Sequence, residues 1–166
     1  MFTTTNYSGE RTADYELICE QLKHVVEGED DLVANLANAS ALLAQFLTDI
    51  NWVGFYLLKS GELVLGPFQG LPACVRIAYG KGVCGTALAK RETMLVADVR
   101  SFPGHIACDA QSRSEIVIPL FDSEGHVFGV LDIDSPKIAR FDAIDQKWLE
   151  RFSTVLSTAL RPVLSA

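Results

Sequence analysis

The chain is poor in basic residues and has no long hydrophobic run. Its 14 Lys and Arg residues face 21 Asp and Glu residues, which gives a formal net charge of −7 at pH 7. Nucleic acids and anionic membrane surfaces bind proteins through Lys and Arg contacts that release counterions. No apolar run approaches the roughly 18 residues that cross a bilayer, and the first residues lack the basic and apolar parts of a secretion signal. We therefore expect a cytoplasmic protein that binds neither nucleic acid nor membrane.

Disorder is also not expected, because 49% of the 166 residues are hydrophobic and only 21% are charged. A chain of this length buries one good core and is too short for two independent domains. We expect a single domain over residues 1–166, with residues 1–9 as a loosely held terminus.

The four cysteines are not arranged as close Cys-x-x-Cys pairs. Without an export signal they should be reduced thiols, because cytosolic buffers keep structural disulfides rare. A zinc site of Cys74, Cys84, Cys108 and His105 can be written down. Its cysteine spacings of ten and twenty-four residues are unlike those of structural zinc sites, so this alternative is weak.

Hydrophobic periodicity predicts an α+β fold with a mainly antiparallel central sheet sandwiched by helices. Two hairpins and one short strand provide the sheet, and the stretch 67–85 is rich in Gly and Pro, which should interrupt regular structure. Helices are expected over about 10–28, 32–48, 82–90 and 141–160. Strands are expected over 52–58, 63–65, 94–97, 115–121 and 126–134.

Three of the cysteines lie in or beside irregular backbone, whereas Cys19 lies on the apolar face of the first helix. A cysteine on a periodic apolar face serves packing, while a nucleophile needs exposure and a depressed pKa. Any one of Cys74, Cys84 and Cys108 could be a small apolar filler, but three fillers in loops are less expected. A dithiol mechanism fits better, in which one thiolate attacks an electrophile and a second thiol resolves the sulfenic acid as a disulfide.

Acidic and aromatic side chains near these loops suggest a pocket. Asp132 and Asp134 are two apart and share one strand face, and Glu115 opens the partner strand. Such carboxylates could hold an ammonium group or supply a proton, although a solvated strand face explains them equally well. Trp52 and Tyr56 also share a face and could be either pocket walls or core aromatics.

Five motifs of the chain together resemble one known family. They are Asn51-Trp-Val-Gly-Phe-Tyr56, Gly66-Pro-Phe-Gln-Gly70, Gly80-Lys-Gly-Val-Cys-Gly85, His105-Ile-Ala-Cys-Asp109, and Glu115-Ile-Val-Ile-Pro-Leu120 with Leu131-Asp-Ile-Asp-Ser135. These motifs, in this order, resemble the free methionine-(R)-sulfoxide reductases, which are built on the GAF fold. The resemblance runs from about residue 15 to residue 160.

The resemblance implies a cofactor-free reduction of free methionine-(R)-sulfoxide. Cys108 would attack the sulfoxide sulfur, methionine would leave, and the sulfenic acid would condense with Cys74 as the main resolving residue, with Cys84 as an auxiliary one. Thioredoxin would reduce the disulfide, and the enzyme would be a homodimer.

The same resemblance assigns the pocket residues. Glu115, Asp132 and Asp134 would bind or protonate the substrate, and Trp52 and Tyr56 would enclose its methyl end. The alternative is a GAF-type sensor that binds a small ligand without catalysis.

Overall fold

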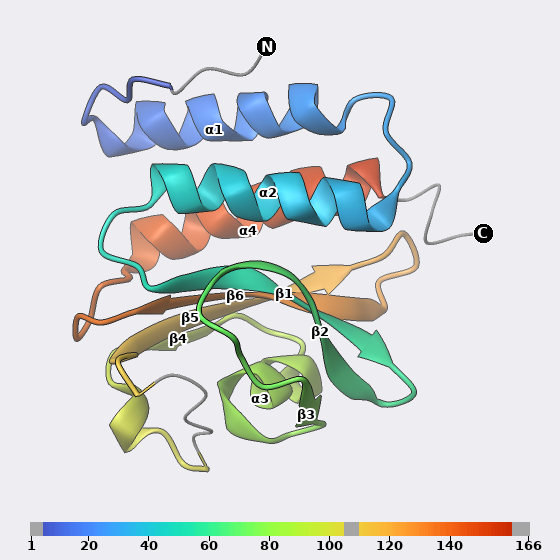
Figure 1. The fold of residues 1–166 in the computed structure, drawn as a ribbon, viewed down its shortest axis with the longest axis vertical. Coiled ribbons are helices and arrows are strands. Elements are labelled where there is room, and N and C mark those ends of the chain that lie inside the picture. The colour runs from blue at the N-terminus through green and yellow to red at the C-terminus, as the bar shows by residue number, and fades with distance from the viewer. Residues whose placement is uncertain (1–4, 105–109, 161–166) are drawn as a thin grey trace.

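The computed structural model describes residues 5–104 and 110–160 (Figure 1). Within them the chain forms four α-helices, six strands and one short 3-10 helix. In chain order these are α1 (Arg11–Val26), α2 (Leu32–Phe46), β1 (Trp52–Lys59), β2 (Glu62–Gly70), β3 (Arg76–Ala78), α3 (Gly82–Lys90), β4 (Met94–Val96), η1 (Val99–Ser101), β5 (Ser114–Phe121), β6 (Val127–Ser135) and α4 (Ala143–Ala159).

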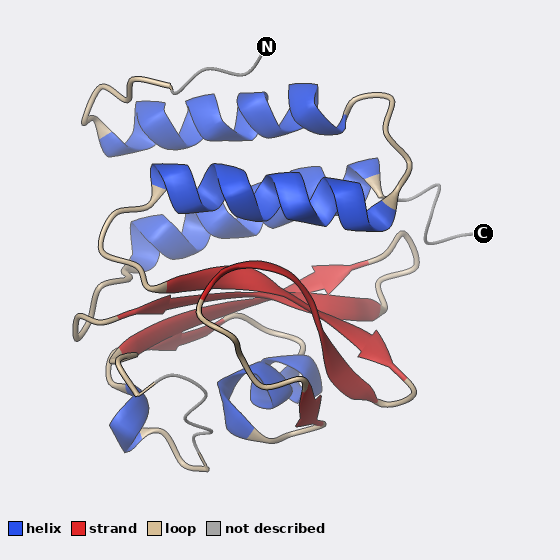
Figure 2. Ribbon diagram, in the orientation of Figure 1, coloured by secondary structure: helices blue, strands red, loops and turns tan. Residues whose placement is uncertain are grey.

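The strands form one antiparallel sheet in the order β3-β2-β1-β6-β5-β4. Figure 2 shows the layers: α2 and α4 lie on one face of the sheet, α1 lies outside them, and α3 lies on the opposite face. The predicted α+β architecture, with an antiparallel sheet between helices, is confirmed. Among the described residues no helix combines the length and apolar character needed to cross a membrane.

Successive side chains of the central strands point to opposite faces of the sheet, so the core has two parts. On β1, Val53 and Phe55 face the helical layer, while Trp52 and Tyr56 face α3. Both faces of β1 are buried, because β1 lies between β2 and β6 and each face is covered by helices. The side toward α3 is the smaller of the two, and it holds the polar side chains described below.

The prediction that regular structure is interrupted from residue 67 onward is wrong at two points. Strand β2 continues to Gly70, and β3 pairs with its beginning. Pro67 is tolerated because the β1–β2 register shifts between Gly54 and Tyr56, which leaves Phe55 opposite two residues. Proline indicated an end to the strand, but here it lies in a bulge.

The N-terminal and C-terminal helices are joined by a buried polar contact. The Tyr15 hydroxyl donates a 2.7 Å hydrogen bond to Asp145, which also accepts from Arg140 at 3.3 Å. Asp145 completes a capping box with Asp142 at the start of α4. Cys19 is buried in the same helical layer, which confirms its packing role.

The segment that precedes α1 is tied to that helix where it is described. Ser8 donates from its backbone and its hydroxyl to Asp14, each at 2.7 Å. The Tyr7 ring also packs edge-on against Phe46. Residues 1–4 lie outside the described residues.

Candidate active site

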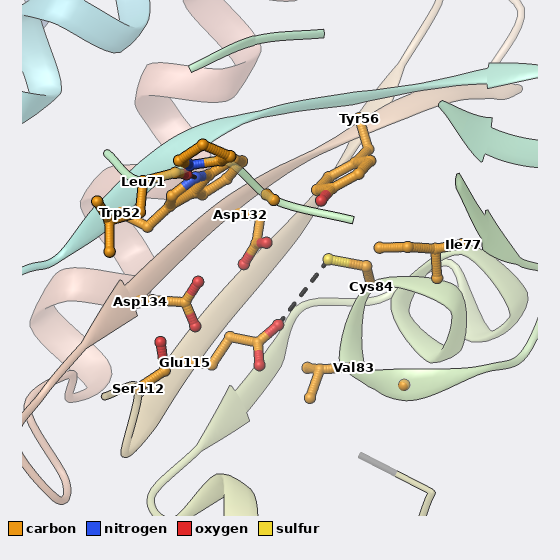
Figure 3. Close-up of a pocket in the computed structure, with 13 residues that line it drawn as sticks. Trp52, Tyr56, Leu71, Ile77, Val83, Cys84, Ser112, Glu115, Asp132 and Asp134 are labelled. Atoms are coloured by element: carbon orange, nitrogen blue, oxygen red, sulfur yellow. Dashed lines mark hydrogen bonds between the residues drawn. The ribbon is translucent and has the colours of Figure 1, made fainter. Parts of the chain in front are cut away.

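A small cavity of about 40 Å³ lies between the sheet and α3 (Figure 3). Its walls come from β1, β3, β5, β6, the start of α3, the segment that follows β2 and the segment that precedes β5. The lining residues are Trp52, Tyr56, Leu71, Pro72, Ala73, Ile77, Gly82, Val83, Cys84, Ser112, Glu115, Asp132 and Asp134. Six of these residues were predicted from the sequence to have a role in the site: Trp52, Tyr56, Cys84, Glu115, Asp132 and Asp134.

Strand register brings the acidic residues together. Asp134 on β6 lies opposite Trp52 on β1 and opposite Glu115 on β5, so these three residues form one row across the sheet. Asp132 is two residues away on β6 and therefore points to the same face. Figure 3 shows Glu115, Asp132 and Asp134 directed into a common space.

The alternative that Asp132 and Glu115 belong to a solvated strand face is wrong. Each is only 6% exposed. The reason is position in the sheet: β6 lies between β1 and β5, and α3 covers the face on which both carboxyls lie.

Trp52 lies across the sheet because position 54 has no side chain. A Cβ atom on Gly54 would lie 2.7 Å from Trp52 Cη2 and 2.3 Å from Phe68 Cβ. The Trp52 ring stacks on Phe68 and on Tyr56, with ring centroids 5.2 and 5.9 Å apart. Trp52 and Tyr56 are therefore both core aromatics and pocket walls.

The polar ends of these two aromatic side chains hold the segment that covers the pocket. Trp52 Nε1 donates to the Leu71 carbonyl at 3.1 Å, and the Tyr56 hydroxyl donates to the Cys74 carbonyl at 2.9 Å. Both rings thus connect β1 to the segment that carries Cys74.

Cys84 reaches the carboxylates from the first turn of α3. Its Sγ lies 3.9 Å from Glu115 Oε1, and the residue is 3% exposed. The helix can approach β3 closely because position 85 is glycine, where a Cβ would lie 2.4 Å from the Ala78 carbonyl oxygen. Cys84, Glu115 and Asp132 place one ligating atom each within 4.8 Å of one another.

Burial and mutual repulsion change the acidity of this cluster. Desolvation, followed by the charges of Asp132 and Asp134, raises the pKa of Glu115 well above its usual range. Burial also raises the pKa of Asp132 to about 6, against hydrogen bonds from Cys84 and Glu115 that lower it. Desolvation, with the charges of Asp132 and Glu115, raises the pKa of the Cys84 thiol well above its usual value. This arrangement favours the protonated forms of Glu115 and of the Cys84 thiol.

The other cysteines differ in oxidation state, and one of them lies outside the described residues. Cys74 is in a disulfide bond, whereas Cys19 and Cys84 are free thiols. Cys108, the predicted nucleophile, and His105 of the weak zinc alternative lie outside the described residues.

Several lining residues were not identified from the sequence. Ser112 is buried and accepts a 3.0 Å hydrogen bond from Asn51 Nδ2, but a lone serine in an irregular stretch gives no signal. The stretch Leu71-Pro-Ala73 directly precedes Cys74, and this adjacency was the available indication that it covers the pocket.

Comparison with known proteins identifies the family. Residues 31–161 match the GAF domain family. Protein YtsP of Bacillus subtilis (strain 168) is 55% identical over 162 residues, with 96% of this chain and 99% of that protein covered. The free methionine-R-sulfoxide reductase of Escherichia coli (strain K12) is 49% identical over 150 residues, which cover 90% of each chain.

Solved structures agree with this family. The X-ray structure of free methionine-R-sulfoxide reductase from Neisseria meningitidis, in complex with its substrate, has a TM-score of 0.93 and 45% sequence identity, with 99% of each chain covered. Since reductases of this name match nearly the whole chain in both sequence and fold, the chain belongs to the GAF-domain family of free methionine-(R)-sulfoxide reductases and is an oxidoreductase.

Proposed function

We propose that this enzyme reduces free L-methionine (R)-S-oxide to L-methionine through a cysteine sulfenic acid and an intramolecular disulfide. The observation that carries the proposal is the buried cluster of Glu115, Asp132 and Cys84 in a small pocket. Reduction of a sulfoxide needs both a thiol and a proton donor, because the sulfoxide is a poor electrophile until its oxygen is protonated or strongly hydrogen-bonded.

The charges of the pocket suit the ammonium end of a free amino acid. No Lys, Arg or His is among its described lining residues, while three carboxyl groups are. Asp132, whose pKa is about 6, would carry negative charge at neutral pH and attract the ammonium group. Asp134 extends this acidic wall toward Trp52, whose ring would contact the methyl end.

Glu115 is the favoured proton donor. Burial and the neighbouring carboxyls raise its pKa and so favour its protonated form, which is the form that a general acid needs. In the proposed step the Cys108 thiolate sulfur bonds to the sulfoxide sulfur while the sulfoxide oxygen takes the proton of Glu115. Transfer of oxygen to Cys108 then releases methionine, so the substrate gains two electrons and Cys108 becomes a sulfenic acid.

Cys74 is the proposed main resolving thiol and Cys84 the auxiliary one. The Cys74 thiolate attacks the sulfenic sulfur, water leaves, and a disulfide forms. That Cys74 is in a disulfide while Cys84 is a free, buried thiol supports this division. A raised pKa leaves Cys84 mostly protonated, which slows its attack relative to that of a more exposed thiol.

Thioredoxin is the proposed reductant that returns the disulfide to two thiols. This cycle needs a reducing compartment, which supports a cytoplasmic location. The proposed homodimer rests on the family resemblance.

The direct test is turnover of free methionine-(R)-sulfoxide with thioredoxin as reductant. We expect activity in the wild type, loss of activity in Cys108→Ser, and retention in the control Cys19→Ala, which changes a buried thiol outside the pocket. The other sulfoxide epimer and peptide-bound sulfoxide should be poor substrates. Binding of a small ligand with no thiol loss on addition of sulfoxide would instead support the sensor alternative, and full activity of Cys108→Ser would exclude the proposed nucleophile.

A further inference from the structure

The geometry points to a second use of the acidic pocket: we propose that Cys84, Glu115 and Asp132 form a binding site for a thiophilic divalent cation, for which Zn²⁺ is the physiological candidate. Metal binding at this site requires only these residues. The consequence for catalysis, inhibition that competes with substrate, rests in addition on the proposed function.

The three ligating atoms are already close to the separations that a zinc ion imposes. All lie within 4.8 Å of one another, and Cys84 Sγ lies 3.9 Å from Glu115 Oε1. Tetrahedral zinc, with bonds of about 2.3 Å to sulfur and 2.0 Å to oxygen, sets sulfur and oxygen ligands roughly 3.5 Å apart. A movement of a few tenths of an ångström, which side-chain rotation provides, would therefore suffice for this pair.

An independent observation also points to a ligand here. Asp132 is 6% exposed, its Oδ1 atom has no hydrogen-bond partner in the described part of the chain, and the residue lines the cavity. A buried carboxylate oxygen without a donor costs free energy unless a cation or a proton satisfies it. Figure 3 shows Asp132 and Glu115 directed toward the space that the Cys84 sulfur enters from α3.

The surroundings favour a cation and select a soft one. The described lining residues include no basic side chain that would repel it, and Asp134 and Tyr56 are the other ionisable groups that face the cluster. A thiolate beside two carboxylates prefers zinc to magnesium or calcium, which take all-oxygen sites. Three protein ligands leave a fourth position open.

Binding would be coupled to proton release, because a thiol and a carboxyl bind a cation in their deprotonated forms. Three anionic ligands around one divalent ion leave a site with a net charge of −1. The ion would also occupy the carboxylates that the substrate ammonium needs and would remove the proton of the proposed general acid, which explains the expected competition.

The experiment uses the full-length chain with Cys74→Ser and Cys108→Ser, so that Cys84 and Cys19 are its only thiols. Co²⁺ is added as a spectroscopic probe for zinc, since a cobalt–thiolate bond gives a charge-transfer absorption. We expect one equivalent to bind with this absorption, displacement by Zn²⁺, and weaker binding as the pH is lowered, since protons compete for the thiol and the carboxyls.

Matched variants in the same background identify the ligands. Cys84→Ala should abolish the absorption and Cys19→Ala should leave it unchanged. Asp132→Asn and Glu115→Gln should each weaken binding by about tenfold or more. Thermal unfolding of every variant verifies that the loss of binding is not a loss of fold. Stoichiometric cobalt–thiolate binding that survives Cys84→Ala, or the absence of binding by the parent protein, would overturn the proposal.

Inhibition is measured separately on the wild-type enzyme with methionine-(R)-sulfoxide as substrate. Zn²⁺ should raise the apparent KM and leave kcat unchanged. A protein that binds Co²⁺ through Cys84 yet does not reduce the sulfoxide would contradict the proposed function and leave the metal site standing. A protein that reduces the sulfoxide yet does not bind Co²⁺ through Cys84 would contradict the metal site and leave the proposed function standing.

Discussion

The Tyr56 hydroxyl donates a 2.9 Å hydrogen bond to the backbone carbonyl of Cys74. This bond joins a rigid central strand to the segment that carries the disulfide-bonded cysteine. Trp52, on the same strand, donates a similar hydrogen bond to the carbonyl of Leu71, which lies three residues before Cys74. The position of Cys74 relative to the pocket is therefore set by β1.

Tyr56→Phe should slow formation of the disulfide at Cys74 more than it affects substrate binding. Loss of one hydrogen bond of about 1 kcal/mol corresponds to a roughly fivefold change in the population of the positioned segment. Single-turnover assays that follow thiol loss after addition of methionine-(R)-sulfoxide measure this rate. Tyr79→Phe is the matched control, because its hydroxyl makes only a 3.5 Å contact on the exposed side of α3. Equal rates in Tyr56→Phe and Tyr79→Phe would contradict the positioning role.

Glu115→Gln should lower kcat by about 10²- to 10⁴-fold, the usual contribution of a general acid. The amide keeps the shape of the side chain but does not supply the proton. The wild-type rate should decline as alkaline pH deprotonates Glu115, since its pKa is raised by burial and by Asp132 and Asp134. In the Gln variant this alkaline limb should disappear. A variant with nearly full kcat and an unchanged pH profile would show that another group donates the proton.

Asp132→Asn should make the protein more stable at alkaline pH. The pKa of Asp132 is about 6 in the folded protein, above the value of 3.8 for an unperturbed aspartate. Its contribution to stability is therefore fully present below about pH 4 and is lost as the pH rises through about 6. The difference of about two pKa units corresponds to roughly 3 kcal/mol.

The measurement is the free energy of unfolding of both proteins by urea at about pH 4 and about pH 8. The two proteins should be similar at the acidic pH, and the Asn variant should be the more stable at the alkaline pH. The same variant should bind substrate less tightly, because it lacks the charge proposed to attract the ammonium group. Equal stability of the two proteins at about pH 8 would show that Asp132 is not held in an unfavourable ionised state.

Much of this architecture was predictable from the sequence, because periodicity reports which face of an element is buried. Helix α3 was predicted over 82–90 and has those bounds. The glycine-rich loop ends where its apolar pattern begins, so the start of the helix was visible in the sequence. The extension of β2 through Pro67 was missed because tolerance of that proline depends on a bulge against Phe55, a contact between strands. Periodicity also placed Asp132 and Asp134 on one face but could not say that α3 covers that face.

Tyr15→Phe should lower the free energy of unfolding by about 1.5–3 kcal/mol, the usual contribution of a hydrogen bond to a charged group. Tyr15 is 2% exposed, and its hydroxyl is 2.7 Å from Asp145, so the loss leaves a buried carboxylate with one donor fewer. Tyr7→Phe is the matched control, because its hydroxyl contacts the neutral Gln21 side chain at 3.3 Å in a partly exposed position. Urea unfolding of the two variants provides the comparison, and a similar small loss in both would mean that the Tyr15 hydroxyl adds little to the link that Arg11 also makes with Asp145.

Gly54→Ala should impair the pocket through Trp52. The new Cβ would overlap the Trp52 ring and Phe68, and the Phe68 contact includes backbone at 2.8 Å, so a side-chain rotation alone does not relieve it. We expect a loss of stability of about 1–3 kcal/mol from overpacking and a raised KM as Trp52 shifts from its position opposite Asp134. Gly125→Ala separates the local effect from the loss of glycine in general, because a Cβ there meets nothing within 4 Å, although its positive φ adds some strain. Fluorescence reports the surroundings of the Trp52 ring, but Trp148 also emits, so each glycine variant is also made with Trp148→Phe. A spectral shift in Gly54→Ala but not in Gly125→Ala would confirm that position 54 determines where the Trp52 ring lies.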